Sequence, residues 1–269
     1  MLFGVLAALG FVGGFLSGLL GVGGGIVLVP LLLYIPQLLG LPELGMRHVA
    51  GITITQVFAA ALLGSVIHRQ RHAISPRVVR WMAPGMVAGA AAGGVASKYA
   101  TLAVLEAAFV ALALTAAPLL FLRPPADELA DGPAREFSRP LALIAAVSIG
   151  VLSGLVGVGG AFLTIPAMIY FLGVPTRAAI GSSLGVVLIS SLAGVVAKLV
   201  TGQIVIPWAV ALCAGALPGS WTGATVSGHV SARGLRLLLA ALVLAMALRM
   251  LVDLVVTLRF TSLEAAAIA

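Results

Sequence analysis

The stretch Gly14-Phe15-Leu16-Ser17-Gly18-Leu19-Leu20-Gly21-Val22-Gly23-Gly24-Gly25-Ile26-Val27-Leu28-Val29-Pro30 decides the fold. It places a cluster of glycines inside a long apolar region, where a membrane helix would otherwise stay wound. The same pattern recurs at a constant offset, so that Gly14 corresponds to Gly150 and Pro30 to Pro166. We call the two stretches the first and second glycine motifs. Their repetition predicts two broken helices that face one shared site.

The composition around these motifs is that of a membrane protein. Of 269 residues 61% are hydrophobic and only 9% are charged, and the mean hydropathy is +1.21. A soluble domain has about 25% charged residues. The net charge of +7 comes from basic residues in short loops, which favours anionic lipid over nucleic acid as the partner. A single cysteine, Cys213, excludes an internal disulfide and a cysteine-based metal cluster.

Ten apolar segments follow one another along the chain. They run approximately over 2–20, 25–40, 48–67, 78–97, 102–122, 141–156, 161–173, 178–198, 206–226 and 235–258. We interpret the first as a retained segment and not as a cleaved signal peptide, because it has no basic start and no evident cleavage site. The second, sixth and seventh are shorter than the roughly 20 residues of a full span, so they are either ordinary hairpins or half-helices.

The only long polar stretch divides the chain into two repeats. We expect a first transmembrane repeat over 1–122, a polar cytoplasmic linker over 123–140 and a second transmembrane repeat over 141–269. After the first motif the halves align again at a slightly smaller offset, which pairs Arg47 with Arg177 and Gly51 with Gly181. The predicted fold class is an all-α polytopic membrane protein of two homologous halves.

The basic loops predict that the two halves are inverted. The loop around 68–80 carries four arginines, whereas its counterpart at 198–206 carries only Lys198. Conversely, the loop at 97–102 carries only Lys98, and its counterpart at 228–236 carries two arginines and a histidine. Because basic loops stay cytoplasmic, this alternation and the odd number of segments favour an inverted repeat of five plus five segments. A parallel arrangement remains open if one segment per half is miscounted.

The glycine motifs are the first candidate for a binding site. Glycine permits unwound backbone and close approach of a ligand. A helix that starts just after it presents free N–H groups and the positive end of its dipole to an anion. Polar side chains at aligned places in the third and eighth segments add hydroxyl donors, although such hydroxyls also bond to their own helix. The predicted substrate-binding residues are Ser17, Gly21, Gly23, Gly24, Gly25, Thr53, Ser153, Gly157, Gly159, Gly160, Ala161, Ser182 and Ser183.

Three glycine ladders at four-residue spacing mark faces where helices approach closely. They are Gly10, Gly14 and Gly18; Gly85, Gly89 and Gly93; and Gly215, Gly219 and Gly223. We interpret them as packing surfaces. The partner is either a helix of the same chain or a second subunit, so a homodimer through these faces is one possibility.

Few residues favour other chemistry. Glu106 and Asp253 are the only acids in or near the apolar segments, whereas a cation pump usually lines its path with several. The run Gly181-Ser182-Ser183-Leu184-Gly185 fits the G-x-S-x-G pattern of hydrolases, but no strand precedes it and no histidine and carboxylate accompany it. We therefore expect no enzyme activity, no catalytic residues, no metal and no cofactor.

The segment Ser17-Gly18-Leu19-Leu20-Gly21-Val22-Gly23-Gly24-Gly25 followed by Pro30, repeated from Ser153, resembles the TauE/SafE family. This is the sulfite exporter family within the toluenesulfonate uptake permease superfamily, and the resemblance covers nearly the whole chain. One departure is Ala161, which stands where the first half has Gly25. The resemblance implies a multi-pass transporter of the cell inner membrane for sulfite, organosulfonates or similar small sulfur-containing anions.

The residues and the resemblance agree on an anion carrier. We expect alternating access, in which the anion lies near the midplane between the two motifs while the halves rock around it. The alternative is a passive anion channel, which would show non-saturating conductance and no counterflow of labelled substrate. The expected partners are a small anion and the lipid bilayer.

Overall fold

The computed structural model describes residues 1–20, 24–68, 75–121, 138–174 and 176–226, together with 241, 244–245 and 247–253. This described part is all-helical and contains no strand. The first half holds α1 (Leu2–Leu20), α2 (Gly25–Leu38), α3 (Met46–His68), α4 (Pro76–Tyr99) and α5 (Leu102–Phe121). The second half holds α6 (Arg139–Val156), α7 (Ala161–Pro166), the π-helix η1 (Ala167–Phe171), α8 (Thr176–Val200) and α9 (Ile206–Val226). The predicted all-helical class is confirmed, and most of the tenth expected segment and of the linker lies outside the described residues.

Both glycine motifs interrupt a helix where the sequence predicted it. In the first motif α1 ends at Leu20 and α2 begins at Gly25, and in the second motif α6 ends at Val156 and α7 begins at Ala161. α7 has six residues and continues as the five-residue π-helix η1. Pro30 and Pro166 cannot donate the backbone bond of a regular helix, and Pro166 is the residue at which α7 changes to the wider π-helix.

Within the described ranges, five helices are long and apolar enough to cross a bilayer: Leu2–Leu19, Met46–Ser65, Arg139–Val156, Gly181–Val200 and Ile206–Val226. Large apolar side chains on the outside of these helices stay exposed, for example Ile144 on α6, Val196 on α8 and Val210 on α9. Water would penalise such a surface, whereas lipid accepts it. The chain is therefore a membrane protein.

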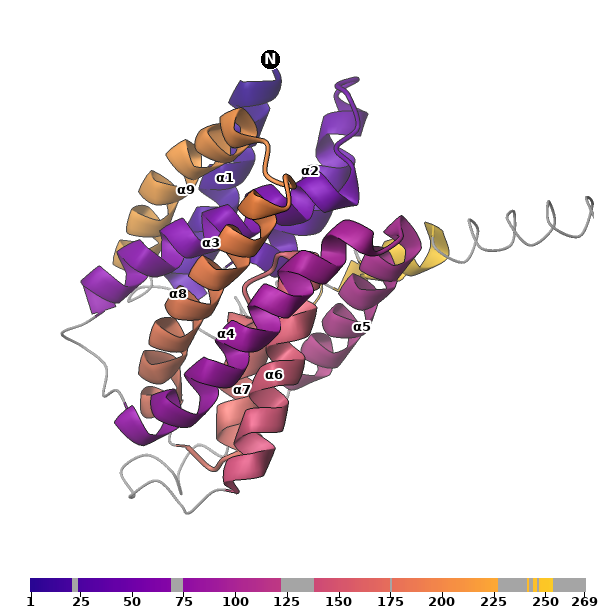
Figure 1. Cartoon of the computed structure of the whole chain (residues 1–269). Helices are drawn as coiled ribbons and strands as arrows, with labels where there is room; N and C mark the ends of the chain where they lie inside the picture. The colour runs from indigo at the N-terminus through magenta and orange to yellow at the C-terminus, as the bar shows by residue number, and fades with distance from the viewer. Residues whose placement is uncertain are drawn as a thin grey trace, which may run out of the picture.

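The helices pack in an interleaved order (Figure 1). α1 lies along α9, and α6 lies along α4, so the first long helix of each half packs on a helix of the other half. α3 likewise contacts α9, and α8 contacts α4. Under the sequence repeat α1 corresponds to α6, α3 to α8 and α4 to α9, so each of these contacts is made twice. α3 and α8 contact each other at the middle of the bundle.

The glycine ladders bring these helix pairs together. A Cβ on Gly14 of α1 would collide with the carbonyl oxygen of Ala216, and one on Gly219 of α9 would collide with that of Phe11. The equivalent pair shows the same fit, since Gly89 of α4 lies against the Val147 carbonyl. The packing role predicted for the ladders is confirmed, and their partners are helices of the same chain. A homodimer stays a prediction.

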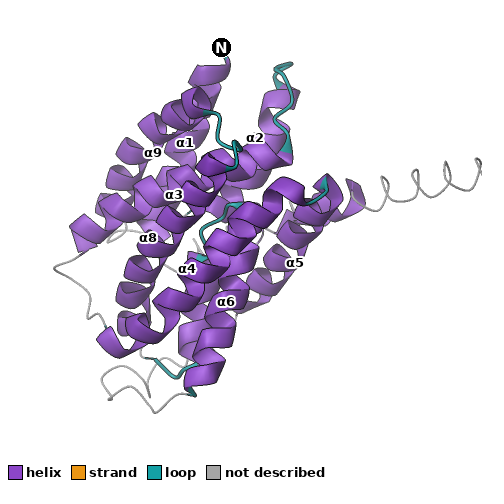
Figure 2. Cartoon of the chain, in the orientation of Figure 1, coloured by secondary structure: helices purple, strands orange, loops and turns teal. Residues whose placement is uncertain are grey.

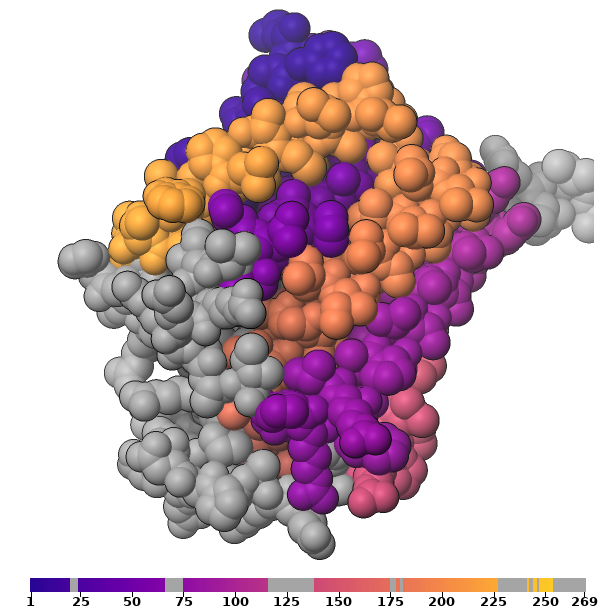
Figure 3. Space-filling view, turned by 60° about the vertical axis from the view of Figure 1, so that its left-hand side comes forward, coloured from indigo at the N-terminus to yellow at the C-terminus, as the bar shows by residue number. Residues whose placement is uncertain are grey.

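The remaining faces place α3 inside the molecule. The space-filling view shows α3 between α9 and α8, whose side chains flank it on both sides (Figure 3). The turn between α8 and α9 crosses the start of α3, where Gly51 lies against the carbonyl oxygen of Gln203 (Figure 2). Consequently most side chains of α3 are buried from its start to Ala61.

Candidate functional site

Two side chains of α3 carry buried polar atoms without hydrogen-bond partners. Thr53 and Gln56 are both fully buried. The hydroxyl of Thr53 and both the oxygen and the nitrogen of the Gln56 amide have no partner within the described structure. Burying an unpaired polar group costs about 1–3 kcal/mol, so such groups in a membrane helix mark a place where a ligand or water binds.

The second glycine motif lies directly against this part of α3. Gly157 packs on the carbonyl oxygen of Ala50, and Gly159 packs on the side chain of Val57. Ala50 and Val57 are two turns apart on one helix face, and Thr53 lies between them on that same face. Thr53 therefore lies on the face of α3 that packs against the turn from Gly157 to Gly159.

The first motif reaches the same place from the other side. A Cβ on Gly25 would lie 2.7 Å from the carbonyl oxygen of Val158 and 3.0 Å from a methyl group of Val57. Val57 thus touches both motifs, and it forms a small buried cluster with Ala61, Ala161 and Val187. Because Val57 and Val187 are equivalent in the repeat, this cluster lies where the two halves meet.

In each motif a left-handed glycine immediately precedes the next helix. Gly24 has φ 61° and precedes α2, and Gly160 has φ 70° and precedes α7. This conformation favours glycine, because a Cβ would be strained there. Each glycine packs against the serine seven residues earlier, Ser17 or Ser153, and both serines are buried. The N–H groups of Val27 and Leu163 donate to the carbonyl oxygens of Gly24 and Gly160 at 3.3 and 3.1 Å. The two N–H groups before each of them have no carbonyl in their own helix.

The structure brings together most of the predicted site residues. Gly25, Gly159 and Ala161 converge on Val57, and Gly157 lies against Ala50, one turn before Thr53 on α3. Gly24, Ser17, Gly160 and Ser153 form the two helix starts. Gly21 and Gly23 lie outside the described residues.

The two serines of α8 are buried but engaged. The Ser182 hydroxyl accepts a hydrogen bond from the backbone N–H of Ser75 at 2.9 Å. Ser183 is fully buried and also has a partner. Both serine hydroxyls thus have partners, whereas the hydroxyl of Thr53, which corresponds to Ser183 in the repeat, has none. Gln56 was not among the predicted site residues, although a buried amide in an apolar segment was a usable signal.

A comparison with known protein families identifies the class to which this membrane protein belongs. The model of the family described as "Sulfite exporter TauE/SafE" matches residues 6–250. The chain belongs to the TauE/SafE sulfite exporter family. Its members are membrane transporters, and the family is not one of enzymes.

Curated relatives of this TauE/SafE chain carry the same general description. A probable membrane transporter protein of Methanocaldococcus jannaschii is 27% identical over 268 residues, covering 93% of this chain and 96% of that protein. A probable membrane transporter protein of Bacillus subtilis is 24% identical, covering 86% of this chain and 89% of that protein. A third, from Haemophilus influenzae, is 26% identical over 72% of each chain. No solved structure matches.

Proposed function

We propose that this protein carries small sulfur-containing anions, such as sulfite or an organosulfonate, across the cell inner membrane. The anion binds at Thr53 and Gln56, between the two glycine motifs. The single observation that carries this proposal is the group of buried, unpartnered polar atoms on α3. A hydroxyl and an amide N–H are neutral donors, so they suit an oxyanion without a costly buried charge.

The same group of atoms narrows the cargo. The Gln56 amide also offers an unpartnered oxygen, which needs a donor. An anion that retains a hydroxyl, such as hydrogen sulfite, or an organosulfonate with an amino group, satisfies both kinds of atom. A fully deprotonated oxyanion has only acceptors and leaves that oxygen unpaired.

Alternating access is the mechanism that fits the repeated contacts. α1 packs tightly on α9 and α6 on α4, so the bodies that rock are these two interleaved helix pairs and not the halves of the sequence, and their motion moves both motifs around Val57.

We further propose that the halves are inverted, with the loops at 68–80 and 228–236 and the linker on the cytoplasmic side. Single cysteines, His72→Cys, Asp131→Cys and Ala232→Cys in a Cys213→Ala background, should then react only with membrane-permeant reagents. Reaction of one of them with an impermeant reagent from outside overturns the inverted arrangement.

Counterflow in proteoliposomes tests the proposed function. Radiolabelled sulfite should accumulate against unlabelled sulfite with saturable kinetics. Gln56→Val, which introduces the residue found at the equivalent place in α8, should lower kcat/KM at least tenfold. A hydrogen bond to a charged group is worth about 1.5–3 kcal/mol, or roughly ten- to hundredfold in affinity.

Gln37→Val is the matched control, because Gln37 lies exposed at the end of α2. It should transport like the parent. Gln56→Val should melt at the parent's temperature or above it, since an unpartnered amide is removed. Transport by Gln56→Val at the parent rate would place the site elsewhere, and sulfite current without counterflow would indicate a channel.

A further inference from the structure

A lysine lies buried near the end of α8. Lys198 has no exposed surface. Its Nζ donates to the hydroxyl of Ser97 at 2.7 Å, to Oε1 of Gln203 at 3.3 Å and to the carbonyl oxygen of Leu155 at 3.4 Å. All three acceptors are neutral. The sequence had placed Lys198 in an exposed loop, and this was wrong because α8 continues to Val200 and α4 and α6 cover the side chain.

No acidic side chain of the described residues compensates this charge. Glu43 is exposed, and Asp253 accepts a hydrogen bond from Tyr34 at 2.9 Å in a separate group that includes Glu106. Arg47 bonds to the same end of α4, because it donates to Ala100, three residues after Ser97, and its charge has the same sign as that of Lys198. An uncompensated charge inside a protein costs several kcal/mol. In a membrane protein a buried charge is a functional-site hypothesis by default.

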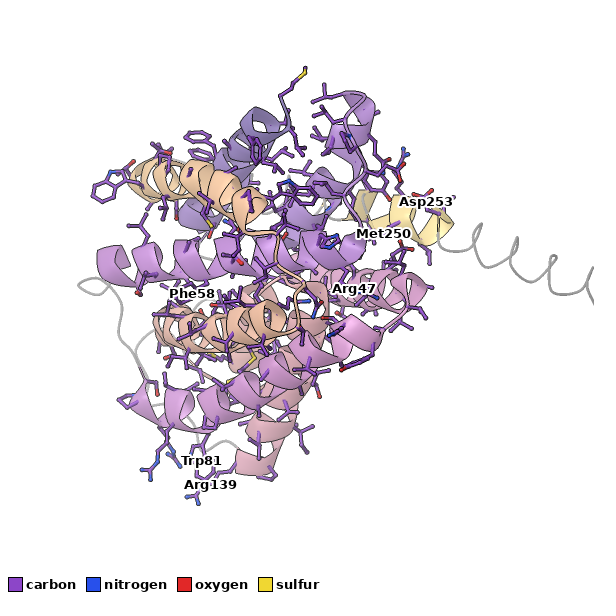
Figure 4. All side chains as sticks on the ribbon, turned by 45° about the horizontal axis from the view of Figure 1, so that its top comes forward. Arg47, Phe58, Trp81, Arg139, Met250 and Asp253 are labelled. Carbon is purple, nitrogen blue, oxygen red and sulfur yellow. The ribbon has the colours of Figure 1, made fainter. Side chains whose placement is uncertain are left out.

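Arg47 is the second cation in this region. It lies in the first turn of α3, far from Arg139 and Trp81 in the view of Figure 4. Its Nη2 donates to the carbonyl oxygen of Ala100 at 3.0 Å. Its Nε is buried and has no partner. Arg47 therefore offers a charge and a free N–H donor close to Lys198.

These two cations lie next to the second glycine motif. Leu155, which accepts from Lys198, is two residues before Gly157, and Gly157 packs on Ala50 of α3. Arg47 precedes Thr53 by six residues, or about 9 Å along the helix. The cations are thus about two turns of α3 from the proposed cargo site, at the end of the bundle where α4 and α8 terminate.

Capping of α4 does not explain the arrangement. Ser97 and Ala100 belong to the end of α4, and cations near a helix C-terminus are stabilising. An exposed lysine performs that task at little desolvation cost, and Lys98 already stands in the same turn on the outside. Capping therefore accounts for the Arg47–Ala100 bond but not for a second cation with no exposed surface.

We propose that Lys198 and Arg47 form a second anion subsite, which holds a small oxyanion as it passes between the cargo site and the adjacent aqueous face. The ligand is of the same chemical class as the cargo, so this inference rests on the proposed function. The guanidinium supplies the free Nε–H, and Lys198 exchanges its two long bonds for a bond to the anion. Ser97 and Gln203 hold the ammonium in place.

Anion-dependent thermal stability tests this subsite without transport. The purified full chain in detergent is titrated with sodium sulfite, and with sodium gluconate at equal ionic strength as the reference. A bound anion raises the melting temperature by mass action. The parent and Gln56→Val should both respond to sulfite, because the second subsite survives in that variant. The charge variants are made in the Gln56→Val background, in which only the second subsite responds. In that background Lys198→Met should require at least tenfold more sulfite for the same shift.

Lys98→Met is the matched control, since it removes the same charge from the exposed side of α4, and it should respond like the parent. Should Lys198→Met fail to fold, Lys198→Arg should keep the response and Arg47→Gln should weaken it at least tenfold. No response of the parent to sulfite, or an undiminished response of both Lys198→Met and Arg47→Gln, overturns the subsite. Loss of the response in Gln56→Val alone also overturns it, while leaving the proposed function in place. Absence of sulfite counterflow in a parent that still responds to sulfite instead overturns the proposed function.

Discussion

Thr53 and Gln56 of α3 correspond in the repeat to Ser183 and Val186 of α8. The first pair is fully buried with no partner for any polar side-chain atom. In the second pair Ser183 has a partner and Val186 has no polar atom to satisfy. The two halves thus repeat their helix contacts but not their interior chemistry. The comparison shows that both halves contribute the same helix packing, whereas the side chains of the proposed site come from α3 alone.

The glycine motifs differ between the halves at one position. Gly25 of the first motif and Ala161 of the second are equivalent, and both lie near Val57. Gly25 has no room for a methyl group, since a Cβ there would lie 2.7 Å from the Val158 carbonyl oxygen. Ala161 already carries one and packs it in the small central cluster. The close approach of the two motifs therefore depends on the first half.

Exchanging these two residues should have unequal effects. In Gly25→Ala the added methyl group collides with the carbonyl oxygen of Val158, and overpacking of this kind costs about 1–3 kcal/mol. We expect its sulfite counterflow to fall at least tenfold and its melting temperature to fall as well. Ala161→Gly removes a methyl group and adds backbone freedom, which costs about 1 kcal/mol. It should retain most of its transport.

The rates of both variants are compared in one proteoliposome preparation, normalised to the amount of inserted protein. Equal losses would mean that the motifs contribute equally and that the difference at this position is incidental. Full activity of Gly25→Ala would show that the two motifs can move apart without any effect on the transport rate.

Much of this architecture follows from local patterns. Glycine at four-residue spacing predicts close helix pairs, because only its side chain lets backbones touch, and Gly14, Gly89 and Gly219 do so. Likewise, the repeated motifs predicted helix breaks at the observed places. Such features depend on neighbours along the chain, which a sequence displays directly.

The unpaired polar atoms were harder to predict from the sequence, because they depend on contacts between helices that are distant along the chain. Lys198 ends an apolar segment, so its burial depends on α4 and α6, which are distant in sequence. A substitution of Gly24 cannot separate binding from folding. A Cβ at Gly24 would collide with the carbonyl oxygen of Gly13 and disturb the packing of α1.

The smallest effects are expected for the equivalent hydroxyls of Thr53 and Ser183, which we predict to have different roles. Thr53→Val removes an unpartnered group while nearly keeping the shape, so the melting temperature should stay or rise. Its KM for sulfite should rise about fivefold, as expected for a hydrogen bond of about 1 kcal/mol. Ser183→Ala removes a group that has a partner. It should lower the free energy of unfolding by about 1 kcal/mol and leave KM unchanged.

Melting temperature and KM must be read together, because each variant should move only one of them. A raised KM in both variants would mean that α8 also contacts the anion and that the site is shared by the halves. A lowered melting temperature of Thr53→Val without a change in KM would mean that its hydroxyl serves the fold. The asymmetry between α3 and α8 holds only if the hydroxyl without a partner affects transport and the one with a partner affects stability.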